Sequence, residues 1–271
     1  MNMALHSGVE RADGFAASEQ APSLRTFLIN LDRAESRLEA MQRQFQQLGM
    51  GFERVAAIDG AMIDLPHAHY DEAAFRRLHG RLTNPAEVGC YLSHVACAQK
   101  LLDSTEAFAL ILEDDLTLPG DLPVVIAEAL AAHAHWDVLR LSTVNSGRKF
   151  PIVAMSGDRA LAIALTREKG SGAYLINRHA AEWICTRLVP MRLPYDIAFD
   201  LEFFAGLRGM FISPEPISQE TDFPSDIQQG GKFRLPLQQR LGVYPFRAVL
   251  EIGRVASRAW RLGKYRLIGV R

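Results

Sequence analysis

An apolar run followed by three carboxylates constrains this chain more than any other stretch. Residues 107–112 are all apolar, and Glu113, Asp114 and Asp115 follow directly. An apolar run without alternation is typical of a strand buried on both faces, as in a parallel sheet under helices. Three successive acids must leave that core, and the carboxyl end of a central strand is where open α/β sheets bind ligands. The stretch therefore predicts an α/β fold with an acidic site at a strand end.

The spacing of the three acids favours a divalent cation. In extended backbone, Glu113 and Asp115 point to one side of the strand and Asp114 to the other. Two carboxylates on the same side repel each other unless a cation lies between them, and oxygen atoms are ligands that Mg²⁺ and Mn²⁺ prefer. The alternative is an acidic turn whose aspartates cap backbone amides. The rest of the chain favours the cation.

A strand, a helix and a second strand are expected before this site. Residues 24–31 are mostly apolar and predict a strand, and the following helix carries apolar residues at intervals of three or four and ends at Gly49. Asp32 and Glu35 have the spacing of a capping box at its start. Residues 52–58 predict the next strand, which completes a βαβ unit. Because no glycine-rich phosphate loop follows the first strand, a nucleotide bound here would need a metal at its phosphates.

A buried helix should lead directly into the acidic strand. Asn84 is its expected cap and Pro85 its first residue, and the sequence is apolar nearly all round up to Leu102. Ser93 and His94 interrupt this apolar surface. A satisfied core histidine and a histidine that belongs to the site are about equally supported.

Two later stretches carry further candidates. Lys169 stands in a glycine-containing loop before an apolar strand, where a lysine can approach a phosphate, although such loops are usually turns. Asp196 and Asp200 follow Pro194 at a spacing of four, so they share a face if a helix starts there.

Bulk composition is typical of a globular protein, with 48% hydrophobic and 23% charged residues. No apolar run approaches the roughly 20 residues that cross a bilayer. Residues 1–22 lack the features of a secretory signal and are expected to be disordered. The three cysteines fit neither a disulfide framework nor a zinc motif, which indicates a reducing compartment, and Cys90 and Cys97 are expected to be buried, inert thiols.

The net charge of −1 hides a strong asymmetry. Residues 232–271 hold ten Lys or Arg and one acid, while the remainder holds 20 basic and 30 acidic residues. The basic segment is amphipathic and contains aromatic residues, which favours a helix on an anionic membrane surface. A helix docked on the acidic body is the second alternative. Nucleic acid is not an expected partner, because the body is acidic.

Taken together and in this order, these motifs resemble glycosyltransferase family 25, the lipooligosaccharide-type galactosyltransferases. The similarity covers about residues 24–220. The motifs that carry it are Phe27-Leu28-Ile29-Asn30-Leu31-Asp32-Arg33 with Arg37, Asp59-Gly60, Glu87-Val88-Gly89-Cys90-Tyr91-Leu92-Ser93-His94, Leu110-Ile111-Leu112-Glu113-Asp114-Asp115, Gly172-Ala173-Tyr174-Leu175-Ile176 and Pro194-Tyr195-Asp196.

The resemblance implies a GT-A-like fold with a mainly parallel central sheet flanked by helices. It implies an inverting transfer of a hexose, galactose from UDP-galactose, onto a lipopolysaccharide or lipooligosaccharide core or a related glycan. The acidic motif would hold Mn²⁺ or Mg²⁺, with Asp115 preferred over Glu113 and Asp114 as the direct ligand. Asp196 is the first candidate for the base that takes the acceptor proton, and Asp200 the second.

The resemblance also implies a set of donor-binding residues. Three of them would lie near the uridine, His94 and Lys169 would contact the diphosphate, and Asp59 and Ser93 complete the set. The three at the uridine are Asn30, Asp32 and Arg33.

The sequence thus predicts a tail over 1–22, a GT-A-like domain over 23–231 and a basic amphipathic segment over 232–271. The expected location is the cytoplasm, peripheral on the inner face of the plasma membrane. Two alternatives stay open: a different donor sugar, glucose or N-acetylglucosamine, and a non-catalytic glycan- or membrane-binding module that retains the fold. A metal-dependent hydrolase is disfavoured because the histidines do not cluster in sequence.

Overall fold

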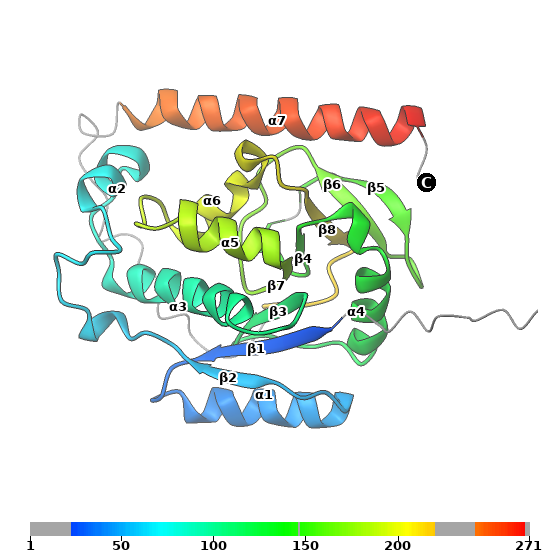
Figure 1. Ribbon diagram of the computed structural model, residues 1–271, viewed down its shortest axis with the longest axis horizontal. Coiled ribbons are helices and arrows are strands. Elements are labelled where there is room, and N and C mark those ends of the chain that lie inside the picture. The colour runs from blue at the N-terminus through cyan, green and yellow to red at the C-terminus, as the bar shows by residue number, and fades with distance from the viewer. Residues whose placement is uncertain (1–22, 146, 220–241, 269–271) are drawn as a thin grey trace, which may run out of the picture.

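The computed structural model describes residues 23–145, 147–219 and 242–268 (Figure 1). The tail predicted over 1–22, and the part of the basic segment before residue 242, lie outside the described residues. Among the described residues no helix combines the length and the apolar character needed to cross a membrane.

One mixed sheet forms the centre of the described chain, in the order β2-β1-β3-β7-β4-β8-β6-β5. Parallel pairing joins β1 to β2 and β3, and β4 to β8, whereas β7, β6 and β5 pair antiparallel with their neighbours. The sheet is therefore mixed rather than mainly parallel, and the α/β class with helices flanking a central sheet is confirmed. The strands are β1 (Leu24–Asn30), β2 (Glu53–Ala56), β3 (Phe108–Glu113), β4 (Val138–Arg140), β5 (Lys149–Ala154), β6 (Ala160–Ala164), β7 (Ala173–Asn177) and β8 (Gly209–Ser213).

Helices cover both faces of the sheet (Figure 1). They are α1 (Glu35–Leu48), η1 (Gly60–Met62), α2 (Glu72–His79), α3 (Pro85–Leu102), α4 (Leu122–Ala131), η2 (His133–His135), α5 (Arg178–Arg187), α6 (Tyr195–Ala198), η3 (Phe199–Ala205) and α7 (Val243–Ile268).

Strand β3 is apolar throughout because it contributes to two cores. Ala109 and Ile111 pack with α3 and α5 on one face, while Leu110 and Leu112 pack with α1 and α4 on the other. Its neighbours on the two sides are β1 and β7. The fully covered strand inferred from the apolar run is confirmed, and only its last residue, Glu113, is partly exposed.

The local signals at helix ends are partly confirmed. Asn84 caps α3 by accepting a bond from the Ala86 amide, and Gly49 ends α1 in the left-handed conformation. The capping box at the start of α1 is wrong: Ala34 occupies the cap position without a side-chain bond, and Asp32 pairs instead with Arg54 of β2. An ion pair with the neighbouring strand has replaced the local cap.

Helix α7 lies along one side of the body, from α2 at one end to β5 and β6 at the other (Figure 1). Its arginines Arg254 and Arg258 are buried and form ion pairs with Asp200 and with Glu202 of η3. For residues 243–268 the structure thus shows the docked helix, the second of the two arrangements expected. The helix also has an exposed outer face, whose large apolar residues are Val249, Ile252, Val255, Trp260 and Leu267.

Candidate functional site

The parallel strands β1 and β3 end together at a cavity of about 130 Å³, here called the acidic cavity. Helix α3 and the loop after β2 form its other walls. The cavity brings together most of the residues that the sequence singled out. Those in its lining are Asn30, Arg33, Asp59, Ser93, His94, Glu113, Asp114 and Asp115.

Asp114 is engaged by neighbours on two sides. The Asn30 side-chain amide donates to its Oδ2 at 2.7 Å, and Arg37 of α1 donates to its Oδ1 at 3.1 Å. Asn30 is itself buried and accepts a bond from Arg54 at its side-chain oxygen. A carboxylate with a cation on one oxygen and an amide on the other is already compensated. Asp114 therefore fixes the end of β3 rather than offering free oxygens to a metal.

Asp115 is in the opposite situation. Its Oδ1 is buried and has no hydrogen-bond partner within the described part of the chain. Burial raises the pKa of Asp115 to about 6, and the charges of Glu113 and Asp114 add to this effect. A partnerless carboxylate oxygen next to a second carboxylate is costly, and a bound cation would remove that cost. An unpartnered oxygen of Asp115 in the same cavity as Glu113 is therefore compatible with a bound divalent cation.

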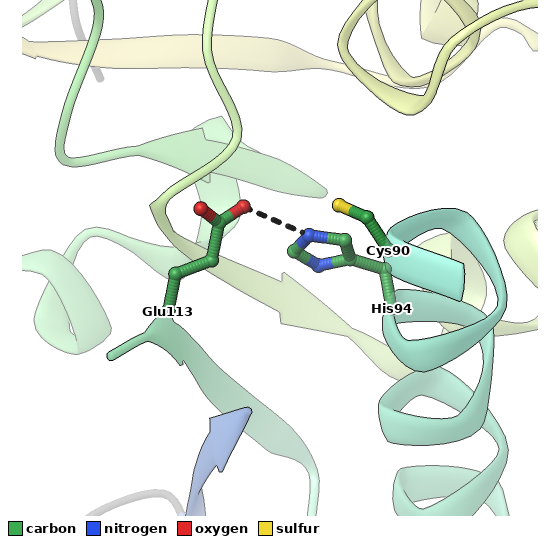
Figure 2. A group of neighbouring side chains, drawn as sticks. All are labelled: Cys90, His94 and Glu113. Carbon is green, nitrogen blue, oxygen red and sulfur yellow. Dashed lines mark hydrogen bonds and ion pairs between the residues drawn. The ribbon is translucent and has the colours of Figure 1, made fainter. Parts of the chain in front are cut away.

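Glu113 connects the acidic strand to α3. His94 Nε2 lies 3.1 Å from Glu113 Oε1 (Figure 2). His94 Nδ1 lies 2.9 Å from the Tyr174 hydroxyl. The ring of Tyr195 stacks on the imidazole with a centroid distance of 4.2 Å. The histidine is fully buried, so these contacts hold one ring orientation. His94 thus belongs to the site. The sequence alone had supported this role and that of a core histidine about equally.

Ser93 stabilises the wall of the cavity. Its hydroxyl accepts a bond from the Ile58 amide at 2.8 Å and donates one to the Gly89 carbonyl at 2.7 Å. A Cβ at Gly89 would lie 2.3 Å from the Ile58 carbonyl oxygen, so glycine is needed for this close approach. The bond from the Ile58 amide to Ser93 and the close approach of Ile58 to Gly89 hold the loop after β2 against α3.

The other residues predicted to bind the donor differ in whether they line the acidic cavity. Arg33 and Asp59 pair with each other at the rim of the acidic cavity. Asp32 is outside the lining and pairs with Arg54, with its side chain 81% exposed. Lys169 is exposed, and its backbone amide donates to the Asn145 side chain. The structure does not bring Asp32 and Lys169 into the acidic cavity.

The two candidate bases, Asp196 and Asp200, differ in their exposure to solvent and in their ion pairs. Asp196, in the first turn of α6, is partly exposed and pairs with Arg167 at 2.9 Å. The adjacent residue Tyr195 stacks on His94 in the wall of the acidic cavity, so Asp196 lies near that cavity.

Asp200 has no exposed surface, and it forms ion pairs with Arg140, Arg254 and Arg258. An acceptor hydroxyl cannot reach a carboxylate buried in this way. Asp200 therefore stabilises the junction with α7, and its interpretation as a second candidate base is corrected.

Two residues of the site stand in motifs quoted from the sequence but were given no role there. Cys90 lines the acidic cavity, which the sequence did not indicate, and burial raises the pKa of its thiol, in keeping with the inert thiol expected. Its spacing of four from His94 on one helix was the available signal. Arg37 balances Asp114, which nothing in the local sequence of α1 indicates.

The chain is similar to known glycosyltransferases. The family model described as "Glycosyltransferase family 25 (LPS biosynthesis protein)" matches residues 23–199. Curated relatives include procollagen galactosyltransferase 1-B of Xenopus laevis, 27% identical over 51% of this chain and 24% of that protein. A glycosyltransferase 25 family member of Drosophila melanogaster is 34% identical over 34% of this chain and 16% of that protein.

A third relative, from Bos taurus, is named "Probable inactive glycosyltransferase 25 family member 3" and is 27% identical over 42% of this chain and 21% of that protein. The matched region thus spans no more than about a quarter of any of these three relatives. The family model covers well over half of the chain, including both strands that end at the acidic cavity. This chain therefore belongs to glycosyltransferase family 25.

Proposed function

We propose that the protein is a metal-assisted, inverting glycosyltransferase that moves galactose from UDP-galactose onto a lipopolysaccharide or lipooligosaccharide core or a related glycan. The observation that carries the proposal is the partnerless oxygen of Asp115 beside Glu113, in a cavity at the ends of two parallel strands. The family description, which names LPS biosynthesis, and the relative named procollagen galactosyltransferase support the transfer class and the sugar.

The acidic cavity suits the charged end of the donor. At about 130 Å³ it is smaller than the roughly 300–1,000 Å³ of pockets that enclose a whole ligand. It therefore fits the diphosphate with its cation, while the uridine and sugar extend past the rim formed by Arg33 and Asp59. Mn²⁺ or Mg²⁺ bound there would offset the charge of the departing UDP. Glu113 and Asp115 would hold the ion, and Asp114 keeps the end of β3 in place.

Asp196 is the proposed base. Inversion requires a carboxylate that takes the proton of the acceptor hydroxyl on the side opposite the leaving group. Asp196 is partly exposed and follows Tyr195, which stacks on His94 in the wall of the acidic cavity, and Arg167 holds one of its oxygens. The ion pair with Arg167 fixes the carboxylate, and the proton would pass from the acceptor to it.

A donor screen tests the proposal. Purified protein with Mn²⁺ is incubated with UDP-galactose, UDP-glucose and UDP-N-acetylglucosamine, and release of UDP is measured. We expect release to be fastest with UDP-galactose, to be abolished by EDTA and to be lost in Asp115→Asn. Asp158→Asn, in the exposed turn between β5 and β6, serves as the matched control and should keep the activity. Absence of UDP release from all three donors would contradict the proposal.

A non-catalytic module is the second candidate function, favoured by the relative whose name includes "probable inactive". Calorimetry with UDP and Mn²⁺ separates the two. A module that binds only glycan or membrane should show no UDP affinity that depends on metal. An enzyme should show such affinity together with turnover.

We further propose that the protein works in the cytoplasm, bound to the inner face of the plasma membrane through the outer face of α7. Ile252, Trp260 and Leu267 are among the apolar residues exposed there, and Lys264 and Arg266 are exposed cations on the same helix. An apolar surface flanked by cations is typical of helices that lie on anionic lipid.

A further inference from the structure

A cysteine, a histidine and a glutamate meet in one corner of the acidic cavity (Figure 2). Cys90 and His94 stand one turn apart on the same face of α3, and Glu113 faces them from the end of β3. One sulfur, one imidazole nitrogen and one carboxylate oxygen of this group all lie within 4.8 Å of one another. Two of the three residues, Cys90 and His94, have no part in the function proposed above.

The histidine is arranged as metal-bound histidines are. A ligating histidine usually presents one ring nitrogen to the metal and bonds through the other to a fixed group, which sets its tautomer. His94 Nδ1 lies 2.9 Å from the Tyr174 hydroxyl, and that hydroxyl lies 3.0 Å from the hydroxyl of Tyr195. Nε2 is the nitrogen that faces Glu113. The imidazole is therefore oriented in advance, with its Nε2 directed at the other two ligand groups.

The ligand types select the metal. A thiolate and an imidazole favour Zn²⁺ and similar ions, whereas sites built only from oxygen favour Mg²⁺ and Mn²⁺. Three protein ligands of mixed type leave one position of a tetrahedral ion open, as in catalytic zinc sites. Because the three residues line the acidic cavity, the open position would face the space where a ligand enters.

We propose that Cys90, His94 and Glu113 form a second metal site, selective for Zn²⁺ or Co²⁺ and distinct from the Mn²⁺ or Mg²⁺ site at Asp115. On binding, the Cys90 thiol gives its proton to solvent and the sulfur becomes a direct ligand of the ion. Glu113 belongs to both sites. A bound Zn²⁺ therefore withdraws Glu113 from the ion at Asp115, and Zn²⁺ should inhibit a reaction that depends on Mn²⁺.

The placement of the free cysteines also points to Cys90 as the thiol ligand. Cys90 lines the acidic cavity. The other two free cysteines, Cys97 and Cys185, do not line the acidic cavity.

Titration of the full-length, metal-free protein with Co²⁺ alone tests the proposal. Cobalt bound to a thiolate gives a charge-transfer band in the near ultraviolet that oxygen ligands do not give. We expect this band in the wild type and in Cys185→Ser, and its loss in Cys90→Ser. Tyr174→Phe, which removes the outer partner of the histidine, should keep the band but weaken Co²⁺ binding by roughly 10–100-fold.

The outcomes separate this site from the proposed function. Asp115→Asn should abolish metal-linked UDP binding and leave the cobalt–thiolate band unchanged, because Asp115 is not a ligand of the second site. No band in the wild type, or a band that persists in Cys90→Ser, overturns the second site and leaves the glycosyltransferase proposal untouched. A band in a protein that releases no UDP supports the second site alone.

Discussion

Replacing Asp115 by asparagine should make the metal-free protein more stable at neutral pH while removing its capacity for Mn²⁺. The wild-type carboxylate is buried beside Glu113 and Asp114, and its Oδ1 has no partner within the described chain. Its ionisation therefore opposes folding. Asparagine has nearly the same shape and carries no charge, so the substitution removes that penalty.

The size of the effect follows from the pKa. Asp115 has a pKa of about 6 in the folded chain, against an ordinary value of 3.8. Between these two values the folded state binds more protons than the unfolded state, so the free energy of unfolding falls as the pH rises. Above pH 6 the whole penalty is present, and a difference of about 2 pKa units corresponds to about 3 kcal/mol. We expect the variant to be about 2–3 kcal/mol more stable at pH 8, and equal to the wild type below pH 4.

Urea unfolding in EDTA, followed by circular dichroism at pH 4 and pH 8, measures this difference. Added Mn²⁺ should then stabilise the wild type, by about 2.7 kcal/mol at one hundred times its dissociation constant, and leave the variant unchanged. Asp114→Asn is the matched control and should destabilise, because Arg37 and Asn30 lose a charged partner. If Asp115→Asn were no more stable than the wild type at pH 8, the argument from the buried, partnerless carboxylate would be refuted.

The remaining predictions concern the base and α7. Asp196→Asn should keep metal-linked UDP binding and lose transfer, as measured by calorimetry and product analysis; normal turnover would place the base elsewhere. Arg258→Ala should cost about 3–5 kcal/mol in urea unfolding, because two buried carboxylates lose a partner. Arg266→Ala, at an exposed position of the same helix where the guanidinium lies over the Phe150 ring, should cost no more than about 1 kcal/mol. Trp260→Ala should weaken sedimentation with anionic vesicles about fivefold, matching a loss of about 1 kcal/mol of apolar burial, and unaltered sedimentation would argue against the membrane contact.

The acidic strand and its site could be predicted because their signals are local. The apolar run before Glu113 has no alternation, since β3 contributes to both cores, and the acids that follow have to leave that interior. The start of α3 was equally readable, because Asn84 and Pro85 act within one turn of helix. Because β1 and β3 are parallel and end side by side, the motifs that follow them lie together although they are distant in sequence.

What could not be predicted depends on distant partners. The direction of β7, which separates β3 from β4, is not encoded in its own five residues. Asp32 has the spacing of a helix cap, but it forms an ion pair with Arg54 of the neighbouring strand instead. Asp200 was interpreted as a base because its three arginine partners are distant in sequence; one of them, Arg258, lies 58 residues further along the chain. Each of these outcomes was decided by tertiary contacts that no local window contains.

The burial of Arg258 against Glu202 also sets an order of events during synthesis. The two residues are 56 positions apart. A ribosome that adds about 5–20 residues per second needs about 3–11 seconds to pass from one to the other. Throughout that interval Glu202 lacks its arginine partner, and until Arg254 is added Asp200 can pair only with Arg140. The buried ion pairs between η3 and α7 can therefore form only after α7 has been synthesised.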